Sequence, residues 1–555
     1  MAPPTLREPS MLGLDFDAPS GAEAEVFNCV IEGEIPKQLD GTFYRVCPDV
    51  QVDPMNPDDV NFNGDGMVSA FRFRDGHVDF KNKYVRTEKF VRERRARRAL
   101  FGKYRNGFTD NPLVAGALRT TANTNIVHLF GHLLALKEDA LPYELDPHTL
   151  RTIGIHNFDG QYTCPTFTAH PKADPISGEV ITYGYEATGD GSRDMIYTLF
   201  NREGKKTEEF HFMAPYCGLC HDIAITPNYV VFQMFPLVCE PERLKSGGNH
   251  WVFDEMIPMH TCLIPRRAPK TEDVRWFTWR PNYFQVPPFR KVTFRTLSSA
   301  TAKYTWISRS SMEMVTYLLA RNLSFVNLIL NLSSAMRWFP DKKGYAPPRP
   351  NLKTFFARFE LDPKTTKLEL EDPENILDMS GEFSRIDDRY QGLPYEWTFY
   401  AAIDATKPFD VAGSRGRPFP GFNALARLNN RTKVIDQYWA GPCASFGEPS
   451  FIPRSPDAAE GDGYVICLVN RFDSQLSELV VIDTNDFTKH IALVKLPLRV
   501  RPGLHGNWIP REVMVDQEAE LVDFEWVPAT FDGPAAPEIS GANIAVRGSR
   551  SGGFE

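Results

Sequence analysis

The stretch SAFRFRDGHVDFKNKYVRTEKF, residues 69–90, carries the pattern that decides the predicted fold. Apolar and polar residues alternate before Asp75-Gly76, and the alternation resumes after this pair. Such alternation on both sides of an Asp-Gly pair is a strong signal of a β-hairpin, because these two residues tolerate the positive φ angles of a tight turn. We therefore predict two antiparallel strands here.

Stretches with this pattern recur along the chain, each interrupted by Gly, Asn, Asp or Pro. They are HLLALKEDALPYELDPHTL (132–150), YVVFQMF (229–235), KTFFARFELDPKTTKLEL (353–370) and SELVVIDTNDFTKHIALVKL (477–496). Many hairpins in one long chain without a linker predict an all-β fold, a β-propeller that occupies residues 1–555 as a single domain. The pattern has no WD or kelch signature and does not predict the number of blades. Helical periodicity is confined to residues 88–104 and a stretch near 310–335.

The composition is that of a soluble globular protein. Apolar residues make up 42% of the 555 residues and charged residues 24%. The 62 basic and 71 acidic side chains leave a net charge of −9, which argues against a nucleic-acid-binding protein. The N-terminal stretch MAPPTLREPSMLGLDFDAPS lacks the apolar core of a signal peptide, so we expect a cytoplasmic protein whose nine cysteines are reduced.

One motif raises the question of a prosthetic group. In YCGLCHDIAIT (216–226), Cys217, Cys220 and His221 have the C-x-x-C-H spacing that attaches a c-type haem. Covalent haem attachment normally accompanies export or an organelle, which the N-terminus does not predict. The alternative is that His221 holds a metal together with other residues.

Two more of the twelve histidines have similar surroundings. His170 in FTAHPKADP and His505 in GLHGNWIP, like His221, follow a small or apolar residue and precede a turn, as expected at the end of a blade strand. A lone histidine is usually a surface residue or a satisfied core residue. Ligands far apart in sequence can nevertheless converge on a propeller axis, where neutral imidazoles suit iron, zinc or copper.

A series of motifs resembles the carotenoid cleavage oxygenase superfamily. The motifs are GEIPKQLDGTFYRVCPD (33–49), FNGDGMVSAFRF (62–73), FTAHPKADP, CHDIAIT, GEFSRIDDR (381–389), FGEPSFIP (446–453) and GLHGNWIP. The resemblance covers nearly the whole chain and implies a seven-bladed β-propeller with a few helices and loops forming a cap. It also implies one non-haem Fe(II) per chain on the central axis, with O2 as co-substrate, held by four histidines. His170, His221 and His505 match three of them, and the haem interpretation falls.

The resemblance implies further residues around the iron. Glu138, Glu382 and Glu448 match glutamates that accept the free N–H of the imidazoles and so fix their tautomers. Without the motifs, each would be interpreted as a surface charge. Thr124 in ANTNIV matches a threonine next to the sixth coordination position, which would limit how substrate and O2 approach the iron.

Around LALKEDALPYELDP (134–147) the chain resembles the stilbene-cleaving branch, which acts on lignostilbenes and resveratrol-like compounds. There a lysine and a tyrosine contact the para-hydroxyl of a small hydrophobic phenolic substrate, and Lys137 and Tyr104 match them. An ammonium within ~4–6 Å of a phenol favours the phenolate, which would push electron density into the central double bond. Resveratrol would yield 4-hydroxybenzaldehyde and 3,5-dihydroxybenzaldehyde. The alternatives are a solvated lysine and an ordinary packing tyrosine, or cleavage of a carotenoid, an apocarotenoid or a phenylpropene.

Residues 283–336 depart from the family pattern. The third iron histidine should lie here, but the chain has no histidine between His260 and His490. The hairpin pattern stops, and six basic residues accompany one acidic residue. We expect this aberrant segment to be poorly ordered, or to form a helix outside the propeller. It results from a shifted reading frame or mis-called intron, or it marks a genuine loss of one ligand, or another group such as His260 or water completes the site.

Two functions therefore remain open. One is an Fe(II)-dependent stilbene dioxygenase, and the other is an inactive propeller that binds a small aromatic molecule or another protein. The apolar run MVTYLLARNLSFVNLILNL (314–332) contains Arg321, which would cost at least ~2.5–3.5 kcal/mol near a bilayer centre, so we expect no transmembrane span. Weak contact with a membrane surface is the alternative for this run. The sequence does not predict an oligomeric state.

Overall fold

The computed structural model describes residues 21–514, with gaps at 57–58, 255, 280–303, 311–352, 360, 371–373, 378 and 416–420. The chain divides into two compact units, Met1–Val515 and Asp516–Glu555, and the second lies outside the described residues. The single domain over residues 1–555 therefore stays a prediction.

The hairpin predicted from residues 69–90 is confirmed. Strands β4 (Asp65–Arg74) and β5 (His77–Tyr84) pair in antiparallel fashion. Asp75 and Gly76 between them have φ angles of 51° and 84°, the positive values that a two-residue type I′ turn requires.

The strands form a succession of sheets, and apart from the parallel pair β19–β22 their pairing is antiparallel. The first three sheets contain β1 (Ala24–Val26), β5, β4, β3 (Gly41–Asp49) and β33 (Gly506–Pro510); β6 (Asn125–Leu129), β7 (His132–Leu136), β8 (Tyr143–Leu145) and β9 (Thr152–Ile155); and β10 (Lys172–Ala173), β11 (Val180–Tyr185), β12 (Asp194–Phe200) and β13 (Lys206–Met213). The fourth contains β14 (Gly218–Leu219), β15 (Ile223–Ile225), β16 (Tyr229–Val238), β17 (Val252–Phe253), β18 (His260–Pro265), β19 (Arg275–Trp279) and β22 (Glu369–Leu370). The last three contain β20 (Tyr304–Ser310), β21 (Lys353–Phe359) and β23 (Glu374–Leu377); β24 (Ser380–Arg385), β25 (Trp397–Ile403), β26 (Ala424–Asn429) and β27 (Ile435–Tyr438); and β2 (Val30–Gly33), β32 (His490–Lys495), β31 (Leu476–Asp483), β30 (Gly463–Arg471), β28 (Ala444–Phe446) and β29 (Ser450–Pro453).

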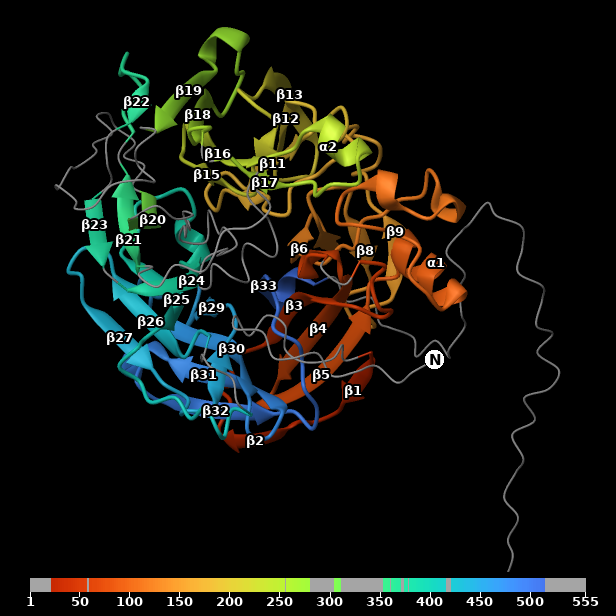
Figure 1. The fold of residues 1–555 in the computed structure, drawn as a ribbon. Helices are drawn as coiled ribbons and strands as arrows, with labels where there is room; N and C mark the ends of the chain where they lie inside the picture. The colour runs from red at the N-terminus through yellow and green to blue at the C-terminus, as the bar shows by residue number, and fades with distance from the viewer. Residues whose placement is uncertain are drawn as a thin grey trace, which may run out of the picture. The chain divides into compact units, whose positions relative to one another are not determined.

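The sheets follow one another around a common centre within the first unit, as Figure 1 shows. Strands from both ends of the described chain close this ring. Strand β2 pairs with β32, and β33 pairs with β3, so the first and last sheets each contain strands from both ends. Closure of this kind leaves few open sheet edges. The prediction of an all-β propeller is confirmed.

The number of blades differs from the expected seven. Six of the sheets have four or more strands, as a propeller blade does, whereas β20, β21 and β23 form a sheet of only three. The described residues therefore contain six complete blades. The reason lies in residues 283–336, of which only β20 is described, paired with β21. The remainder of this segment lies outside the described residues, so its exclusion from the propeller stays a prediction.

Helices are few among the described residues, as expected. They are α1 (Glu88–Ala96), α2 (Pro241–Lys245) and the short 3-10 turns η1 (Asn61–Asn63), η2 (Gly107–Thr109), η3 (Pro112–Val114), η4 (Thr271–Asp273), η6 (Asp388–Tyr390), η7 (Thr484–Asp486) and η8 (Arg511–Val513). Thr87 is the N-cap of helix α1, and its side chain accepts a hydrogen bond from the Phe90 N–H. It ends before the periodicity of residues 88–104 does, because Arg97 adopts a left-handed φ of 53°. None of the described helices has the length and apolar character needed to span a membrane.

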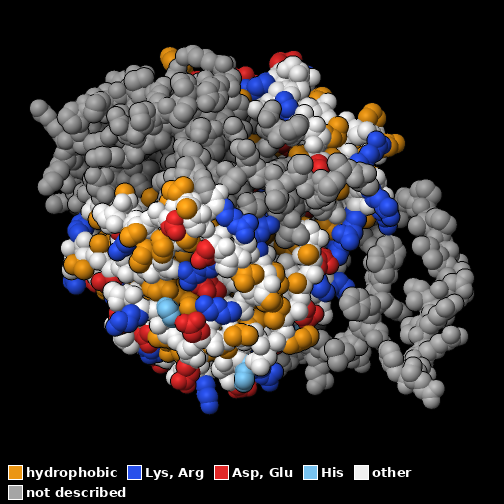
Figure 2. All heavy atoms as spheres, turned by 60° about the horizontal axis from the view of Figure 1, so that its bottom comes forward, with side chains coloured by type: hydrophobic (Ala, Val, Ile, Leu, Met, Phe, Trp, Pro, Cys, Tyr) orange, Lys and Arg blue, Asp and Glu red, His pale blue; other side chains and the backbone are white. Residues whose placement is uncertain are grey.

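Apolar side chains between neighbouring sheets form the core. One cluster joins Phe43, Phe71 and Phe80 of the first sheet to Leu468 and Leu479 of the last. Full burial of such a side chain contributes about 1.5–3 kcal/mol, so this cluster helps to hold the ring closed. On the face that Figure 2 shows, acidic and basic side chains are instead interspersed among apolar ones.

Candidate metal centre

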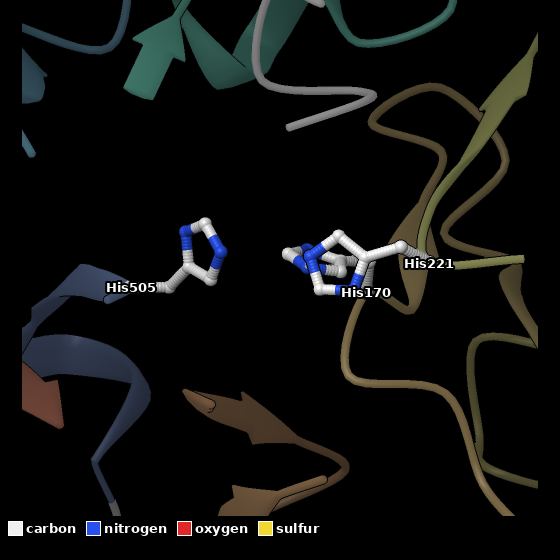
Figure 3. Close-up of side chains that lie close together, drawn as sticks. All are labelled: His170, His221 and His505. Carbon is white, nitrogen blue, oxygen red and sulfur yellow. The ribbon is translucent and has the colours of Figure 1, made fainter. Parts of the chain in front are cut away.

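Three histidines from distant parts of the chain meet near the centre of the first unit. His170 lies two residues before β10, His221 between β14 and β15, and His505 directly before β33. The three side chains point toward one another in Figure 3, and each residue is at most 5% exposed. The Nε2 atoms of His170 and His221 are 3.1 Å apart, and one ring nitrogen from each histidine lies within 4.8 Å of the others.

The backbone around His505 explains how this residue reaches the centre. Its N–H donates to the carbonyl oxygen of Thr124 at 3.2 Å. The next residue, Gly506, pairs with Arg45 of β3, and a Cβ at this position would lie 2.6 Å from the Tyr44 carbonyl oxygen. A residue without a side chain is therefore required for β33 to approach β3.

Two buried carboxylates lie directly behind the histidines. The Oε1 atom of Glu138 is hydrogen-bonded to His221 Nδ1, and that of Glu448 lies 3.1 Å from His505 Nδ1. Burial alone would raise the pKa of each carboxyl. His221 nevertheless lowers the pKa of Glu138 to about 2, and Arg385 and His505 do the same for Glu448. An ionised carboxylate can only accept, so it fixes the proton on Nδ1 and the lone pair on Nε2, the tautomer in which Nε2 can bind a metal.

Asp222 is a buried carboxyl near the centre that sequence reasoning missed. Its Oδ2 atom lies 3.8 Å from His170 Nδ1, and its Oδ1 atom pairs with Lys172 at 2.6 Å. Its position directly after His221 in the motif CHDIAIT was the available signal.

Glu382 differs from the other two predicted glutamates. It is buried in β24, and among the described residues its Oε1 atom has no hydrogen-bond partner. Burial and the nearby Glu448 raise its pKa well above the usual range. The next residue, Phe383, has a left-handed φ of 57° and its ring centroid lies 5.9 Å from that of His505. The structure thus places Glu382 near the centre, but among the described residues none of the three histidines forms a hydrogen bond with its Oε1 atom.

His260 does not join the three histidines. It lies at the start of β18, where its Nδ1 atom is 2.9 Å from the Pro258 carbonyl oxygen and its ring packs against Tyr216. The suggestion that His260 completes the site is therefore not supported by its position.

Lys137 and Tyr104 lie next to each other in the interior. The ammonium of Lys137 is 4.9 Å from the centroid of the Tyr104 ring and donates to the Phe62 carbonyl oxygen at 2.8 Å and to Thr121 Oγ1 at 2.6 Å. Lys137 is 4% exposed, so it is not a solvated strand lysine. Burial lowers its pKa to about 8. Thr124 is also buried, and its hydroxyl donates to Asn123 Oδ1 at 3.2 Å.

The donor set suits a divalent first-row transition metal. Three converging imidazoles would bind iron, zinc, copper or nickel, and the ionised Glu138 and Glu448 would balance part of the charge of the ion. The Oε1 atom of Glu382, which has no hydrogen-bond partner among the described residues, adds an unsatisfied buried oxygen near this set. Metal binding at this position is thus chemically reasonable.

The comparisons with known proteins agree with the fold and this donor set. Residues 17–510 match the family described as retinal pigment epithelial membrane protein. Carotenoid cleavage oxygenase 1 of Neurospora crassa is 44% identical over 511 residues, which cover 91% of this chain and 92% of that protein. Resveratrol cleavage oxygenase 1 of Aspergillus fumigatus is 40% identical over 509 residues, which cover 91% and 97%. The crystal structure of Pseudomonas brassicacearum lignostilbene dioxygenase is 39% identical in sequence and superimposes with a TM-score of 0.79. The match covers 92% of this chain and 100% of that chain. The chain therefore belongs to the carotenoid oxygenase family, whose members named here are oxygenases.

Proposed function

We propose that the chain is a non-haem Fe(II) dioxygenase that cleaves the central C=C bond of 4-hydroxystilbenes such as resveratrol. One O2 molecule is consumed, and each carbon of the double bond ends as an aldehyde that carries one oxygen atom. The observation that carries this proposal is the buried ammonium of Lys137 against the ring of Tyr104, in a protein whose three central histidines could hold a metal. Two of the relatives are named for resveratrol and lignostilbene.

His170, His221 and His505 would hold the Fe(II), which supplies the site where O2 is activated. Three imidazoles suffice for a viable iron site, so a site without the third histidine of the family pattern could still be active. Glu138 and Glu448 would keep His221 and His505 in the tautomer that presents Nε2. Glu382 would do the same for a further ligand, and Thr124 would restrict the approach of substrate and O2.

Lys137 and Tyr104 would bind the 4-hydroxyl of the substrate. Lys137 uses two of its three donors on Phe62 and Thr121, which leaves one for the phenol oxygen. An ammonium this deeply buried strongly favours a phenolate partner, because burying it unpaired is costly. The phenolate then increases the electron density of the conjugated double bond.

Cleavage of a carotenoid or apocarotenoid is the second candidate, since one relative is named as a carotenoid cleavage oxygenase. A polyene without a hydroxyl would offer the buried ammonium of Lys137 no hydrogen-bond acceptor and would add no charge to those of Asp139 and Glu138 nearby. This argument favours the phenolic substrate. An inactive propeller is the other alternative, and it predicts that the protein does not retain iron.

The test is turnover of resveratrol by the Fe(II)-loaded full chain and by Lys137→Met. We expect both aldehydes from the unaltered protein, and at least a hundredfold loss of kcat/KM in Lys137→Met with the iron content unchanged. The matched control is Lys83→Met, a partly buried lysine of β5 outside this cluster, which should retain activity. Unchanged turnover in Lys137→Met would refute the role of this lysine, and loss of iron would mean that it acts on the metal centre instead.

A further inference from the structure

A second cluster of metal-binding side chains lies away from the three histidines. Glu186 directly follows β11, Cys239 directly follows β16, and His250 lies in the loop after α2. One donor atom from each of these residues lies within 4.8 Å of the others, and each residue is at most 4% exposed. Glu186 and Cys239 thus lie at the ends of strands of the third and fourth sheets.

A second cysteine lies beside this cluster. Cys217 is opposite Cys239 across the pair β14–β16, where the Cys239 N–H donates to the Cys217 carbonyl oxygen at 3.2 Å. The Cys217 thiol donates to Glu186 Oε1 at 3.4 Å, and the two cysteine side chains also interact. Two thiols, one imidazole and one carboxylate are therefore gathered within the protein interior.

The orientation of His250 is that of a metal ligand. Its Nδ1 atom lies 2.7 Å from the carbonyl oxygen of Arg105, which can only accept, so Nδ1 carries the proton. In the neutral imidazole Nε2 then carries the lone pair that can bind a metal, and it lies 3.0 Å from Glu186 Oε2. Metal-ligating histidines commonly donate their second nitrogen to a backbone carbonyl in this way.

We propose that Cys217, Cys239, His250 and Glu186 form a buried binding site for Zn²⁺. Two sulfur ligands, one nitrogen and one oxygen match the four-coordinate sites that this borderline-soft ion prefers.

The charges in the cluster support the assignment. Arg105 forms an ion pair with Glu186. Once the thiols have lost their protons, Zn²⁺, two thiolates, the carboxylate and the guanidinium sum to zero. A buried group of charges with no net charge avoids the large penalty of an unpaired buried ion. The thiol protons, and the proton of any charged His250, pass to solvent when the metal binds.

The competing interpretation is an ion-pair network without a metal. Burial alone would lower the pKa of His250, but Glu186 raises it to about 9, so in the metal-free protein an imidazolium can bridge to that carboxylate. This network is built on Arg105, Glu186 and His250, and the cysteines add only the Cys217 thiol bond to Glu186 and their contact with each other. Only the metal site requires both thiols, and this difference is what an experiment can measure.

The ion would connect two blades to the loop that carries Tyr104. Glu186 follows a strand of the third sheet, Cys217 and Cys239 flank strands of the fourth, and the carbonyl of Arg105, the neighbour of Tyr104, accepts from His250. An ion that binds only the folded state stabilises it. Zinc should therefore raise the temperature at which the protein unfolds.

The first test is metal content. The full chain is saturated with Fe(II), exposed to one equivalent of Zn²⁺, passed through a desalting column and analysed for both metals. We expect one zinc per chain in the unaltered protein and less than a tenth of that in Cys239→Ser and in Cys217→Ser. Cys29→Ser removes a buried cysteine of another core cluster and should retain zinc. Retention of zinc by the Cys217 and Cys239 variants, or no zinc in the unaltered chain, would overturn the proposal.

A second measurement does not depend on how the variants fold. Co²⁺ is added in place of Zn²⁺ to the iron-loaded unaltered protein, and the near-ultraviolet spectrum is recorded. Thiolate ligands give an intense charge-transfer band that histidine and carboxylate ligands do not give. We expect this band, and we expect one equivalent of Zn²⁺ to remove it. A cobalt spectrum without the band would contradict thiolate ligation, even if some metal is bound elsewhere.

Discussion

Two residues of one short motif, Cys217 and His221, take part in two different clusters. His221 joins His170 and His505 in a set of imidazoles, and carboxylates form hydrogen bonds to the imidazoles from outside the set. Cys217 joins a set in which thiols, a carboxylate and an imidazole lie close enough to bind one ion. The spacing that resembles a haem attachment motif thus arises where the chain passes between the two clusters.

The contrast indicates how donor type and arrangement would separate two metals in one fold. Neutral imidazoles leave a bound Fe(II) with its charge and with positions for O2, while carboxylates behind them fix their orientation. A closed set of thiolates, imidazole and carboxylate instead satisfies four-coordinate Zn²⁺ and leaves no position for a substrate. The first arrangement suits chemistry, and the second suits stability.

The largest expected effects come from mutations that each remove one of the two metals. His221→Ala should remove bound iron and reduce resveratrol turnover below detection while the zinc content stays at one per chain. Cys217→Ser should remove zinc while iron and the initial turnover remain within about twofold. Metal analysis and aldehyde production on the same samples provide the check. If both variants lose the same metal, the two clusters are not independent.

A smaller effect is expected from the carboxylates behind the histidines. Glu448→Gln keeps the size of the side chain but removes the charge that orients His505, and we expect iron affinity to fall about 10–100-fold. The control is Glu478→Gln, a buried glutamate paired with Arg471 and Lys495 on β31. Competition with a chelator measures the affinity of both. Equal affinities would show that Glu448 does not act on the metal centre.

Acid should destabilise both clusters. The folded-state pKa of Glu138, Glu186 and Glu448 is about 2, against about 4.3 for a free glutamate. Lowered pKa values contribute stability above the unfolded value, and this stability is lost as the pH falls from about 5 toward 2, by about 3 kcal/mol per group at most. The midpoint of thermal unfolding, followed across this range, should fall less steeply in Glu186→Gln and Glu448→Gln. A slope equal to that of the unaltered protein would contradict the assignment.

The smallest expected effect on stability is that of Glu382, and its dependence on pH has the opposite sign. Burial and Glu448 raise the pKa of Glu382, so its contribution to stability is present at acid pH and is lost as the pH rises above the unfolded value. Glu382→Gln removes a carboxyl whose Oε1 atom has no hydrogen-bond partner among the described residues, and we expect a gain of about 1 kcal/mol at pH 7. Denaturant unfolding of this variant beside Glu478→Gln gives the comparison. A loss of stability in Glu382→Gln would show that its carboxylate is paired in solution.

The sequence predicted the parts of the fold that depend on local chemistry. The Asp75-Gly76 pair predicted a hairpin because only a few residue types tolerate the φ angles found there. The end of α1 was missed, since the left-handed conformation of Arg97 does not follow from the identity of that residue. The number of complete blades was also wrong in the described residues, because it came from a family pattern that residues 283–336 do not follow.

In the candidate sites, too, the sequence predicted what local motifs carry and missed contacts between distant residues. The motifs singled out His170, His221 and His505, but local patterns could not show that Asp222 lies beside them or that Lys137 is buried against Tyr104. The cluster of Glu186, Cys239 and His250 had no sequence signal, because its members come from separate strands and loops and no regular spacing links them. Long-range convergence of this kind becomes visible only in the structure.

The most direct test of the central claim is oxygen incorporation. The Fe(II)-loaded full chain is mixed with resveratrol under isotopically labelled O2, and the aldehydes are reduced at once to alcohols, because aldehyde oxygen exchanges with water. We predict one labelled oxygen atom in each of the two products, as required for a dioxygenase that cleaves the central double bond. Iron-loaded protein that forms no aldehydes, or products labelled on only one side after the exchange control, would contradict the account.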